Sequence, residues 1–355
     1  MNKKNDHTYS TIIIGSGQAG LSMAYFLKRN KTDYLILDDN DTPGGSWNKT
    51  WEGLKLFSPS EFSSLSGWRM PKSANEYPTK DEFIDYLSKY EAKYEMPIER
   101  PIRVESVVKQ DGIFIVKTDK QEYRAKTVVS STGTAQNPNI PDYPDSELFT
   151  GTQVHSVDYR TPIDFAGQKV LIVGGGNSGA QVLAEVSLVA NTKWVTLEEP
   201  NFLPKEIDGR YLFNQATAKY QQMLKGVKTE PRKASLSDIV MVESVREAQK
   251  RDALHSVRPF SKFYEDGVIW GNGEKEEFDT VIWCTGFKAN LNHLEDLGII
   301  KNGRIRTKGT MSTEVPGLWL IGYGNWTGYA SATIYGVGKT AREAAKEITS
   351  YLNES

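Results

Sequence analysis

The stretch IIIGSGQAGL, residues 12–21, is a short apolar run that breaks into glycines and continues into a mixed segment. The apolar run at residues 10–14 predicts a buried strand, and the helical spacing of apolar residues over 21–27 predicts an amphipathic helix. A second apolar run at residues 34–37 ends in two aspartates. Strand, glycine turn, helix and strand in this order predict a βαβ unit.

The glycines of this turn are Gly15, Gly17 and Gly20, in the pattern GxGxxG. Such glycines allow a tight turn, a close approach of a pyrophosphate to the backbone, and close helix packing. Asp38 follows at close to the spacing of about 20 residues at which an acid binds the adenosine ribose. An ordinary βα turn is the alternative, and the complete series disfavours it.

The stretch LIVGGGNSGAQ, residues 171–181, has the same form. Its parts follow the order of the first unit, namely a strand at 169–173, Gly174, Gly176 and Gly179, a helix at 180–189, a strand at 193–197, and Glu198 at its end. The two turns lie too far apart to be one split motif. The chain is therefore predicted to bind two dinucleotides.

Composition limits the function classes. A length of 355 residues suits about two domains. Charged residues make up 25% of the chain and the net charge is −2, which favours small-molecule chemistry over nucleic acid or an anionic membrane. The single cysteine, Cys284, excludes an internal disulfide framework and a CxxC redox pair. No apolar run approaches the roughly 20 residues of a membrane span, and we expect a cytoplasmic protein.

The stretch FTGTQVHSVDY, residues 149–159, fits the pattern FxGxxxHxxxY through Phe149, Gly151, His155 and Tyr159. With the glycine turns, it resembles the flavin-containing monooxygenases of the compact bacterial class B type. The related Baeyer–Villiger enzymes usually end this motif in tryptophan, so Tyr159 favours the monooxygenase branch. The resemblance implies that His155 is a hinge and cofactor-positioning residue rather than a proton donor. A hydrogen-bonded linker histidine is the alternative.

The resemblance implies an α/β fold with two Rossmann-like dinucleotide-binding domains. The FAD domain is expected at residues 1–155 and 282–355, and the NAD(P)H domain, at residues 156–281, is inserted into it. The strand-plus-Thr-Gly segments at 128–133 and 281–287 resemble the crossings between the domains. A helix from Ala330 onward is expected to point its N-terminus at the flavin.

The glycine turns and the resemblance together give the expected site residues. Those for FAD are Gly15, Gly17, Gln18, Ala19, Gly20, Asp38, Gly45, Trp47, Thr132, Gly133, Asn325, Thr327 and Ala330. Those for NAD(P)H are Gly174, Gly176, Asn177, Ser178, Gly179, Glu198, Thr285 and Gly286. The catalytic candidates, none with an assigned acid–base role, are Asn75, Trp47 and His155. No metal site is expected, because the histidines lie at no ligand spacing.

Glu198 bears on the choice of coenzyme. NADPH-specific members generally place a basic residue at this strand end, whereas an acid would repel the 2′-phosphate and bind a free 2′-hydroxyl. NADH is therefore expected to be used at least as well as NADPH. Lys193, Lys205 and Arg210 lie near enough in sequence to soften this preference. A solvated acid without a role is the alternative for Glu198.

The function implied is that of an FAD-dependent NAD(P)H oxidoreductase. As a monooxygenase it would use O2 to oxygenate a thioether or amine, or a ketone, through a C4a-(hydro)peroxyflavin. One alternative is a reductase that passes electrons to a quinone, ferredoxin or another acceptor. Another is a flavin-binding accessory or redox-sensing protein. The expected partners are a small-molecule substrate and O2, with a homodimer as an open alternative.

Overall fold

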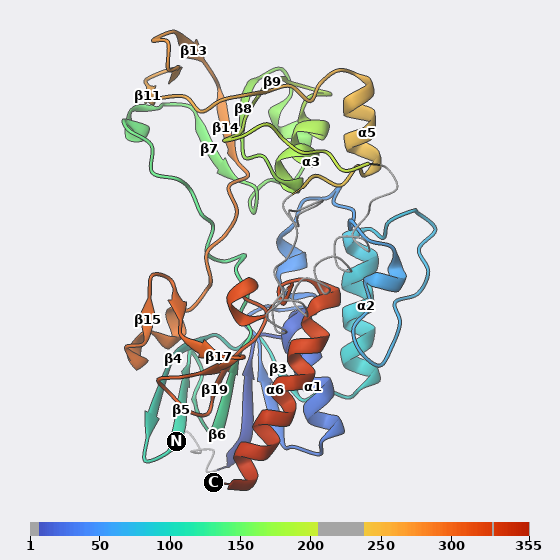
Figure 1. Cartoon of the computed structure of the whole chain (residues 1–355), viewed down its shortest axis with the longest axis vertical. Coiled ribbons are helices and arrows are strands. Elements are labelled where there is room, and N and C mark those ends of the chain that lie inside the picture. The colour runs from blue at the N-terminus through green and yellow to red at the C-terminus, as the bar shows by residue number, and fades with distance from the viewer. Residues whose placement is uncertain (1–6, 205–237, 329, 355) are drawn as a thin grey trace, which may run out of the picture. The chain divides into compact units, whose positions relative to one another are not determined.

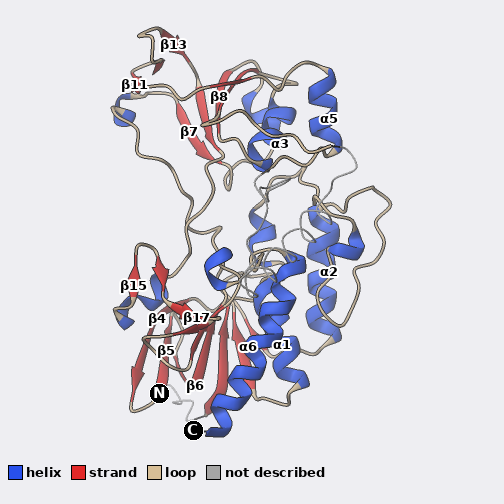
Figure 2. Ribbon diagram, viewed as in Figure 1, coloured by secondary structure: helices blue, strands red, loops and turns tan. Residues whose placement is uncertain are grey.

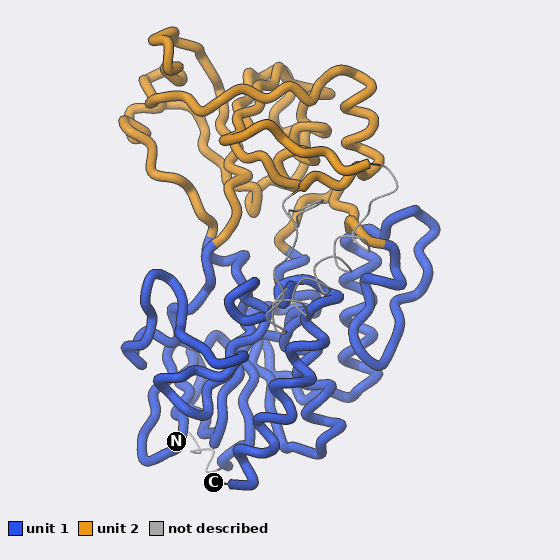
Figure 3. Tube along the Cα trace, in the orientation of Figure 1, with its two compact units in different colours: residues 1–48, 59–137, 288–355 blue, residues 49–58, 138–287 orange. Residues whose placement is uncertain are grey.

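The computed structural model describes residues 7–204, 238–328 and 330–354 (Figure 1). The chain divides into two compact units (Figure 3). Unit 1 contains residues 1–48, 59–137 and 288–355, and unit 2 contains residues 49–58 and 138–287. Each unit combines helices with a largely parallel sheet (Figure 2), which confirms the α/β class predicted from the sequence.

The sheet of unit 1 has a parallel centre with the order β3-β2-β1-β6-β19. These strands are β1 (Thr8–Ile14), β2 (Tyr34–Leu37), β3 (Ile98–Glu99), β6 (Glu122–Ser130) and β19 (Leu318–Leu320). β1 and β2 carry near-continuous apolar runs, as expected of parallel strands that are covered on both faces. Their residues Ile12, Ile14 and Leu35 lie in one buried core with Val128 and Leu320.

Shorter antiparallel strands extend unit 1. They are β4 (Val104–Gln110) and β5 (Ile113–Thr118) beside β6, β17 (Thr307–Lys308) and β18 (Met311–Ser312) beside β19, and the separate pair β15 (Ile300–Lys301) and β16 (Arg304–Ile305). The helices are α1 (Gln18–Arg29), α2 (Lys80–Lys93) and α6 (Ile334–Glu354), with 3₁₀ turns η1 (Gly45–Lys49), η2 (Ser60–Phe62), η5 (Asn292–Leu297) and η6 (Asn325–Thr327). α1 and α6 lie side by side (Figure 1), and Asn30 after α1 donates to the carbonyl of Ala345.

α2 begins with a capping box. The Thr79 hydroxyl accepts from the backbone N–H of Glu82, and the Glu82 carboxylate accepts from the backbone N–H of Thr79. This pair satisfies two N–H groups at the helix start.

The sheet of unit 2 is entirely parallel, with the order β10-β9-β8-β14-β7. These strands are β7 (Thr152–His155), β8 (Lys169–Val173), β9 (Asn191–Val195), β10 (Ser256–Val257) and β14 (Thr280–Trp283). The remaining elements of unit 2 are helices α3 (Asn177–Val186) and α5 (Glu243–Lys250), turns η3 (Ser146–Leu148) and η4 (Pro162–Phe165), and the antiparallel sheet of β11 (Lys262–Tyr264), β12 (Gly267–Ile269) and β13 (Lys275–Glu277).

The unit boundaries differ from the expected domain boundaries at residues 155 and 282. β7 pairs along its whole length with β14, so residues 138–155 belong to unit 2 rather than to unit 1. The second Thr-Gly segment and Phe287 also belong to unit 2, where Phe287 forms a bridge with Pro138. Sheet pairing between strands far apart in sequence sets these boundaries.

Residues Lys49–Ser58 form a strap that belongs to unit 2, although unit 1 precedes and follows it in sequence. The indole of Trp51 donates to Oε1 of Glu185 on α3 at 3.2 Å. The hydroxyl of Tyr159, from the FxGxxxHxxxY motif, donates to Oε2 of Glu185 at 2.8 Å. A Cβ on Gly53 would lie 2.4 Å from the same carboxylate. Glu185 therefore holds the strap and the motif to α3.

The variant Glu185→Gln is expected to change the pH dependence of stability. Burial raises the pKa of the Glu185 carboxyl above its ordinary 4.5, despite the hydrogen bonds from Tyr159 and Trp51. Its stabilising contribution is fully present below the unfolded pKa and is lost as the pH rises through the folded pKa. The free energy of unfolding of the wild type relative to the variant should therefore fall as pH rises above about 4.5.

Chemical denaturation at a series of pH values measures this difference, since the amide of the variant does not titrate. Glu265→Gln, at an exposed position of the same unit, is the control. Parallel stability profiles for the wild type and Glu185→Gln would contradict the prediction.

Candidate functional site

The first glycine turn joins β1 to α1. Gly15 has a φ of +97°, a left-handed value that favours glycine. A Cβ on Gly20 would lie 1.9 Å from the carbonyl oxygen of Gly15, so the packing of helix on strand requires glycine there. A Cβ on Gly17 would meet no atom of the described residues within 4 Å. The open side of Gly17 is the space that a pyrophosphate fills in this motif.

Asp38 directly follows β2 and is 2% exposed. Its Oδ1 accepts from the backbone and side-chain nitrogens of Asn40 at 3.2 and 2.8 Å, and its Oδ2 accepts from the hydroxyl of Ser16 in the glycine turn. Nη2 of Arg100 lies 3.5 Å from the same Oδ2. The predicted ribose-binding acid is thus held beside the glycine turn.

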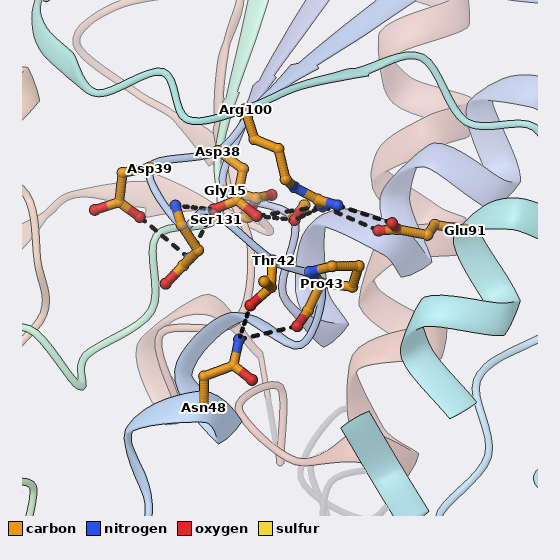
Figure 4. A network of polar contacts seen from close by, with 11 residues as sticks. Gly15, Asp38, Asp39, Thr42, Pro43, Asn48, Glu91, Arg100 and Ser131 are labelled. Atoms are coloured by element: carbon orange, nitrogen blue, oxygen red, sulfur yellow. Dashed lines mark hydrogen bonds and ion pairs between the residues drawn. The ribbon is translucent and has the colours of Figure 1, made fainter. Parts of the chain in front are cut away.

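Arg100 lies beside Asp38 and Ser16 and was not predicted from the sequence. Nη1 and Nη2 donate to the two carboxylate oxygens of Glu91 on α2 at 2.8 and 3.0 Å, and Nη2 also donates to Ser16 at 2.7 Å (Figure 4). Nε of Arg100 is buried and has no hydrogen-bonding partner within the described part of the chain. An unsatisfied buried donor costs about 1–3 kcal/mol. An oxygen atom of a bound nucleotide would satisfy it, so these residues fit the adenosine end of FAD.

The expected flavin-contacting loop meets the same turn. Gly45 has a φ of +57°, and a Cβ on it would lie 2.8 Å from Cα of Gly17. The indole of Trp47 donates to Oε1 of Gln18 at 3.2 Å, and Nε2 of Gln18 donates to the carbonyl of Ala332 at 2.8 Å. Gln18 therefore joins the glycine turn, the loop with Trp47 and the C-terminal segment.

The C-terminal segment differs in part from expectation. α6 begins at Ile334 and not at Ala330, because Ala330 has a left-handed φ of +53° and its carbonyl accepts from Thr333 in a tight turn. Thr327 is fully buried and bonds to Gly324 and Ser331, so its hydroxyl stabilises this turn.

The other expected FAD residues take different positions. Asn325 is exposed, whereas Ala19 and Ala330 are buried. The hydroxyl of Thr132 donates to the carbonyl of Asn290 at 2.6 Å and contacts the hydroxyl of Tyr323 at 2.7 Å. The carbonyl of Gly133 accepts from the backbone of Asn290 at 3.0 Å. Thr132 and Gly133 thus hold the first Thr-Gly segment to Asn290 and Tyr323 within unit 1.

The second glycine turn repeats the geometry of the first. A Cβ on Gly179 would lie 2.1 Å from the carbonyl oxygen of Gly174, and one on Gly174 would lie 2.2 Å from that of Cys284. A Cβ on Gly176, the N-cap of α3, would again meet nothing within 4 Å in the part of the chain that the structure describes. This turn therefore also fits a dinucleotide pyrophosphate.

The two polar residues after this turn differ. The amide of Asn177 donates to the carbonyl of Asp238 at 2.9 Å and accepts from the backbone of Val240 at 2.8 Å, so it fastens that segment. Ser178, in the first turn of α3, is partly buried.

Glu198 is exposed beyond the end of β9, next to Leu197, which is 84% exposed. Of the cations expected to soften its effect, Lys193 is paired with Glu276 at 2.6 Å. Lys205 and Arg210 lie outside the described residues.

His155 is fixed by both ring nitrogens. Nε2 donates to the carbonyl of Gly286 at 3.0 Å, and Nδ1 accepts from the backbone of Val157 at 3.2 Å. Burial lowers the pKa of the ring, which favours the neutral form. Thr285 next to Gly286 bonds to the carbonyl of Asn139 at 2.5 Å. His155 thus ties the motif to the second Thr-Gly segment and has no free nitrogen for proton transfer.

Asn75 lies on the exposed loop before α2, where its backbone N–H donates to Ser73. Within the described ranges, no three or more His, Cys, Asp or Glu side chains are grouped to hold a metal ion. None of the helices in those ranges combines the length and apolar composition of a membrane span.

Comparison with known proteins agrees with this geometry. The family described as pyridine nucleotide-disulphide oxidoreductase matches residues 12–322. The uncharacterized oxidoreductase CzcO of Bacillus velezensis is 32% identical over 96% of this chain and 99% of its own. Indole-3-pyruvate monooxygenase YUCCA1 of Oryza sativa is 26% identical over 95% of this chain and 90% of its own.

A solved structure gives a nearer match. The flavin-containing monooxygenase from Stenotrophomonas maltophilia is 43% identical, with a TM-score of 0.89, over 97% of this chain and 99% of that chain. The fold and the paired glycine turns define a flavoprotein with two dinucleotide-binding units. The chain belongs to the pyridine nucleotide-disulphide oxidoreductase family and, within it, to the flavin-containing monooxygenases. It is an FAD-dependent oxidoreductase that uses NAD(P)H, as the sequence predicted.

Gly17→Ala and Gly176→Ala are expected to separate ligand binding from folding. Neither new methyl group meets an atom of the described residues, so each apoprotein should keep its thermal stability. Gly17→Ala should weaken FAD binding, and Gly176→Ala NADP⁺ binding, by about 10-fold or more, which corresponds to about 1.4 kcal/mol. Flavin fluorescence and calorimetric titration measure the two affinities.

Each variant is the control for the other site, because the change should affect one cofactor only. Gly20→Ala should instead lower the thermal stability, since its methyl group would meet the Gly15 carbonyl. Unaltered affinities in Gly17→Ala and Gly176→Ala would rule out these positions as pyrophosphate sites.

Arg100→Lys is expected to raise the dissociation constant of FAD by about 10-fold, a typical loss for one charge-assisted hydrogen bond. Lysine keeps the charge beside Glu91 but lacks the Nε donor. Fluorescence titration of the apoprotein measures the effect. Arg103→Lys, at an exposed position in the same segment, is the control. Equal affinities in the two variants would show that Nε of Arg100 has no part in FAD binding.

Proposed function

We propose that this flavin-dependent monooxygenase uses NAD(P)H and O2 to transfer one oxygen atom to a small soft nucleophile, a thioether or an amine. The 43% identity to the S. maltophilia flavin-containing monooxygenase, across 97% of this chain, carries the proposal. The FxGxxxHxxxY motif supports it, because the motif resembles the signature of the flavin-containing monooxygenases. Its His155 and Tyr159 make buried hydrogen bonds to Gly286 and Glu185.

The residues of the chain bind and position the cofactors in this proposal. The open turn at Gly17, with Asp38 and Arg100, would hold FAD, and the turn at Gly176 would hold NAD(P)H. Once bound, FAD would accept a hydride from NAD(P)H and activate O2. NAD(P)H, a proton, O2 and a thioether would give NAD(P)⁺, water and a sulfoxide. His155 would keep the neutral tautomer that its two hydrogen bonds set.

A reductase without oxygen transfer is the second function considered. The family description includes disulfide chemistry, which generally needs a reactive thiolate. The single cysteine, Cys284, is buried, and burial raises the pKa of its thiol to about 12. Electron transfer through a cysteine pair is therefore ruled out, and a reductase would have to use an external acceptor.

Oxidation of methyl phenyl sulfide under ¹⁸O₂ tests the proposal. The holoenzyme with NADH or NADPH is expected to form sulfoxide that carries one ¹⁸O atom, in near-equal amounts to the coenzyme consumed. Mass spectrometry gives the isotope content, and absorbance gives coenzyme consumption. Catalase in one set of reactions removes hydrogen peroxide as an indirect oxidant.

Two outcomes would contradict the proposal. Coenzyme oxidation with only hydrogen peroxide as product, for thioethers, amines and ketones alike, would identify a reductase or oxidase. A flavin that NAD(P)H does not bleach under anaerobic conditions would identify an accessory or sensing protein.

A further inference from the structure

Arg258 directly follows β10 and reaches across the carboxyl end of β9. Its Nη1 donates to the hydroxyl and the carbonyl of Thr196 at 3.0 and 3.3 Å. Its Nη2 donates to Ser256 at 2.9 Å and to the carboxylate of Glu199 at 2.6 Å. The guanidinium is thus held in a fixed orientation by the ends of two adjacent parallel strands.

The location of Arg258 relates to the second glycine turn. Thr196 is buried, and its side chain would lie 3.3 Å from a Cβ on Gly175 in that turn. In a dinucleotide-binding βαβ unit, the adenosine ribose lies between the glycine turn and the end of the second strand. Arg258 therefore stands, through Thr196, beside the place where the 2′ position of this ribose would lie.

Among the described residues, the charged side chains on and just after β9 are Lys193, Glu198 and Glu199. Glu198 and Glu199 are both exposed, and Glu199 is the carboxylate that neutralises Arg258. Lys193, the cation on β9 itself, is engaged by Glu276 at 2.6 Å and stacks over Trp270. Arg258 is thus a cation whose carboxylate partner is exposed at the strand end.

We propose that Arg258 binds the 2′-phosphate of NADPH and that Glu199 is its exchangeable counterion, so that the chain accepts both coenzymes. The inference rests on the proposed use of this turn for NAD(P)H. The Glu199 side chain is 79% exposed, and an exposed ion pair contributes only about 0–1 kcal/mol. A phosphate can therefore replace the carboxylate at small cost, and the planar guanidinium suits bidentate phosphate binding.

With NADH the same residues behave differently. Glu199 keeps its bond to Arg258, and the acids at the strand end accept from the free 2′-hydroxyl. The chain thus offers a carboxylate to NADH and a guanidinium to NADPH. NADPH-specific enzymes carry a basic residue directly after the second strand of the unit. In this chain the basic residue is Arg258, which follows the adjacent strand β10.

Calorimetric titration with adenosine 2′,5′-bisphosphate and with 5′-AMP tests this proposal without any redox chemistry. Arg258→Ala is expected to weaken the bisphosphate about 10-fold, a typical loss for hydrogen bonds to a charged group, and to leave 5′-AMP within about 2-fold. Glu199→Gln, which keeps Arg258, is expected to strengthen the bisphosphate because it removes the competing carboxylate. Arg258→Lys should recover part of the affinity.

Lys262→Ala is the matched control, because Lys262 in the same unit is similarly exposed and paired with Asp145 at 2.7 Å. It should change neither affinity. Equal losses of both ligands in Arg258→Ala, or no gain in Glu199→Gln, would overturn the proposal. If Arg258→Ala fails to fold, the Glu199→Gln result decides. These titrations measure binding and not monooxygenase activity. A failure of the proposed function would therefore leave their result unchanged, so the two failures can be told apart.

Discussion

The structure depends on one close contact that occurs twice. The carbonyl oxygen of Gly15 lies so near Gly20, and that of Gly174 so near Gly179, that a single Cβ atom would separate helix from strand. This contact brings each helix N-terminus beside the end of its strand. The first N–H groups of a helix have no partner within the helix. At Gly17 and Gly176 the side where a Cβ would lie is free of described atoms within 4 Å. The nucleotide sites are consequences of this packing.

Features encoded within about thirty residues could be predicted from the sequence. Both βαβ units are local: apolar strands, three glycines, a helix and a terminal acid follow one another along the chain. Asp38 was predicted by spacing, and the structure holds it beside the glycine turn. The family followed from short motifs distributed over most of the chain, and the comparisons confirm it.

Features that depend on partners far apart in sequence could not be predicted. Arg100 and Arg258 reach their positions because β3 and β10 pair with the second strands of the two units. The unit boundary near residue 138 follows from the pairing of β7 with β14. The late start of α6 depends on a left-handed alanine, Ala330, and alanine carries no sequence signal for that conformation.

The strap at Lys49–Ser58 bears on how modular this protein is. Unit 2 is not a continuous insertion, because ten residues of it come from the N-terminal part of the chain. Residues 138–287 expressed alone would leave the carboxylate of Glu185 without Trp51 and would uncover the surface that the strap covers. A second nucleotide unit exchanged as one continuous segment would therefore lose the hydrogen bond between the strap and Glu185.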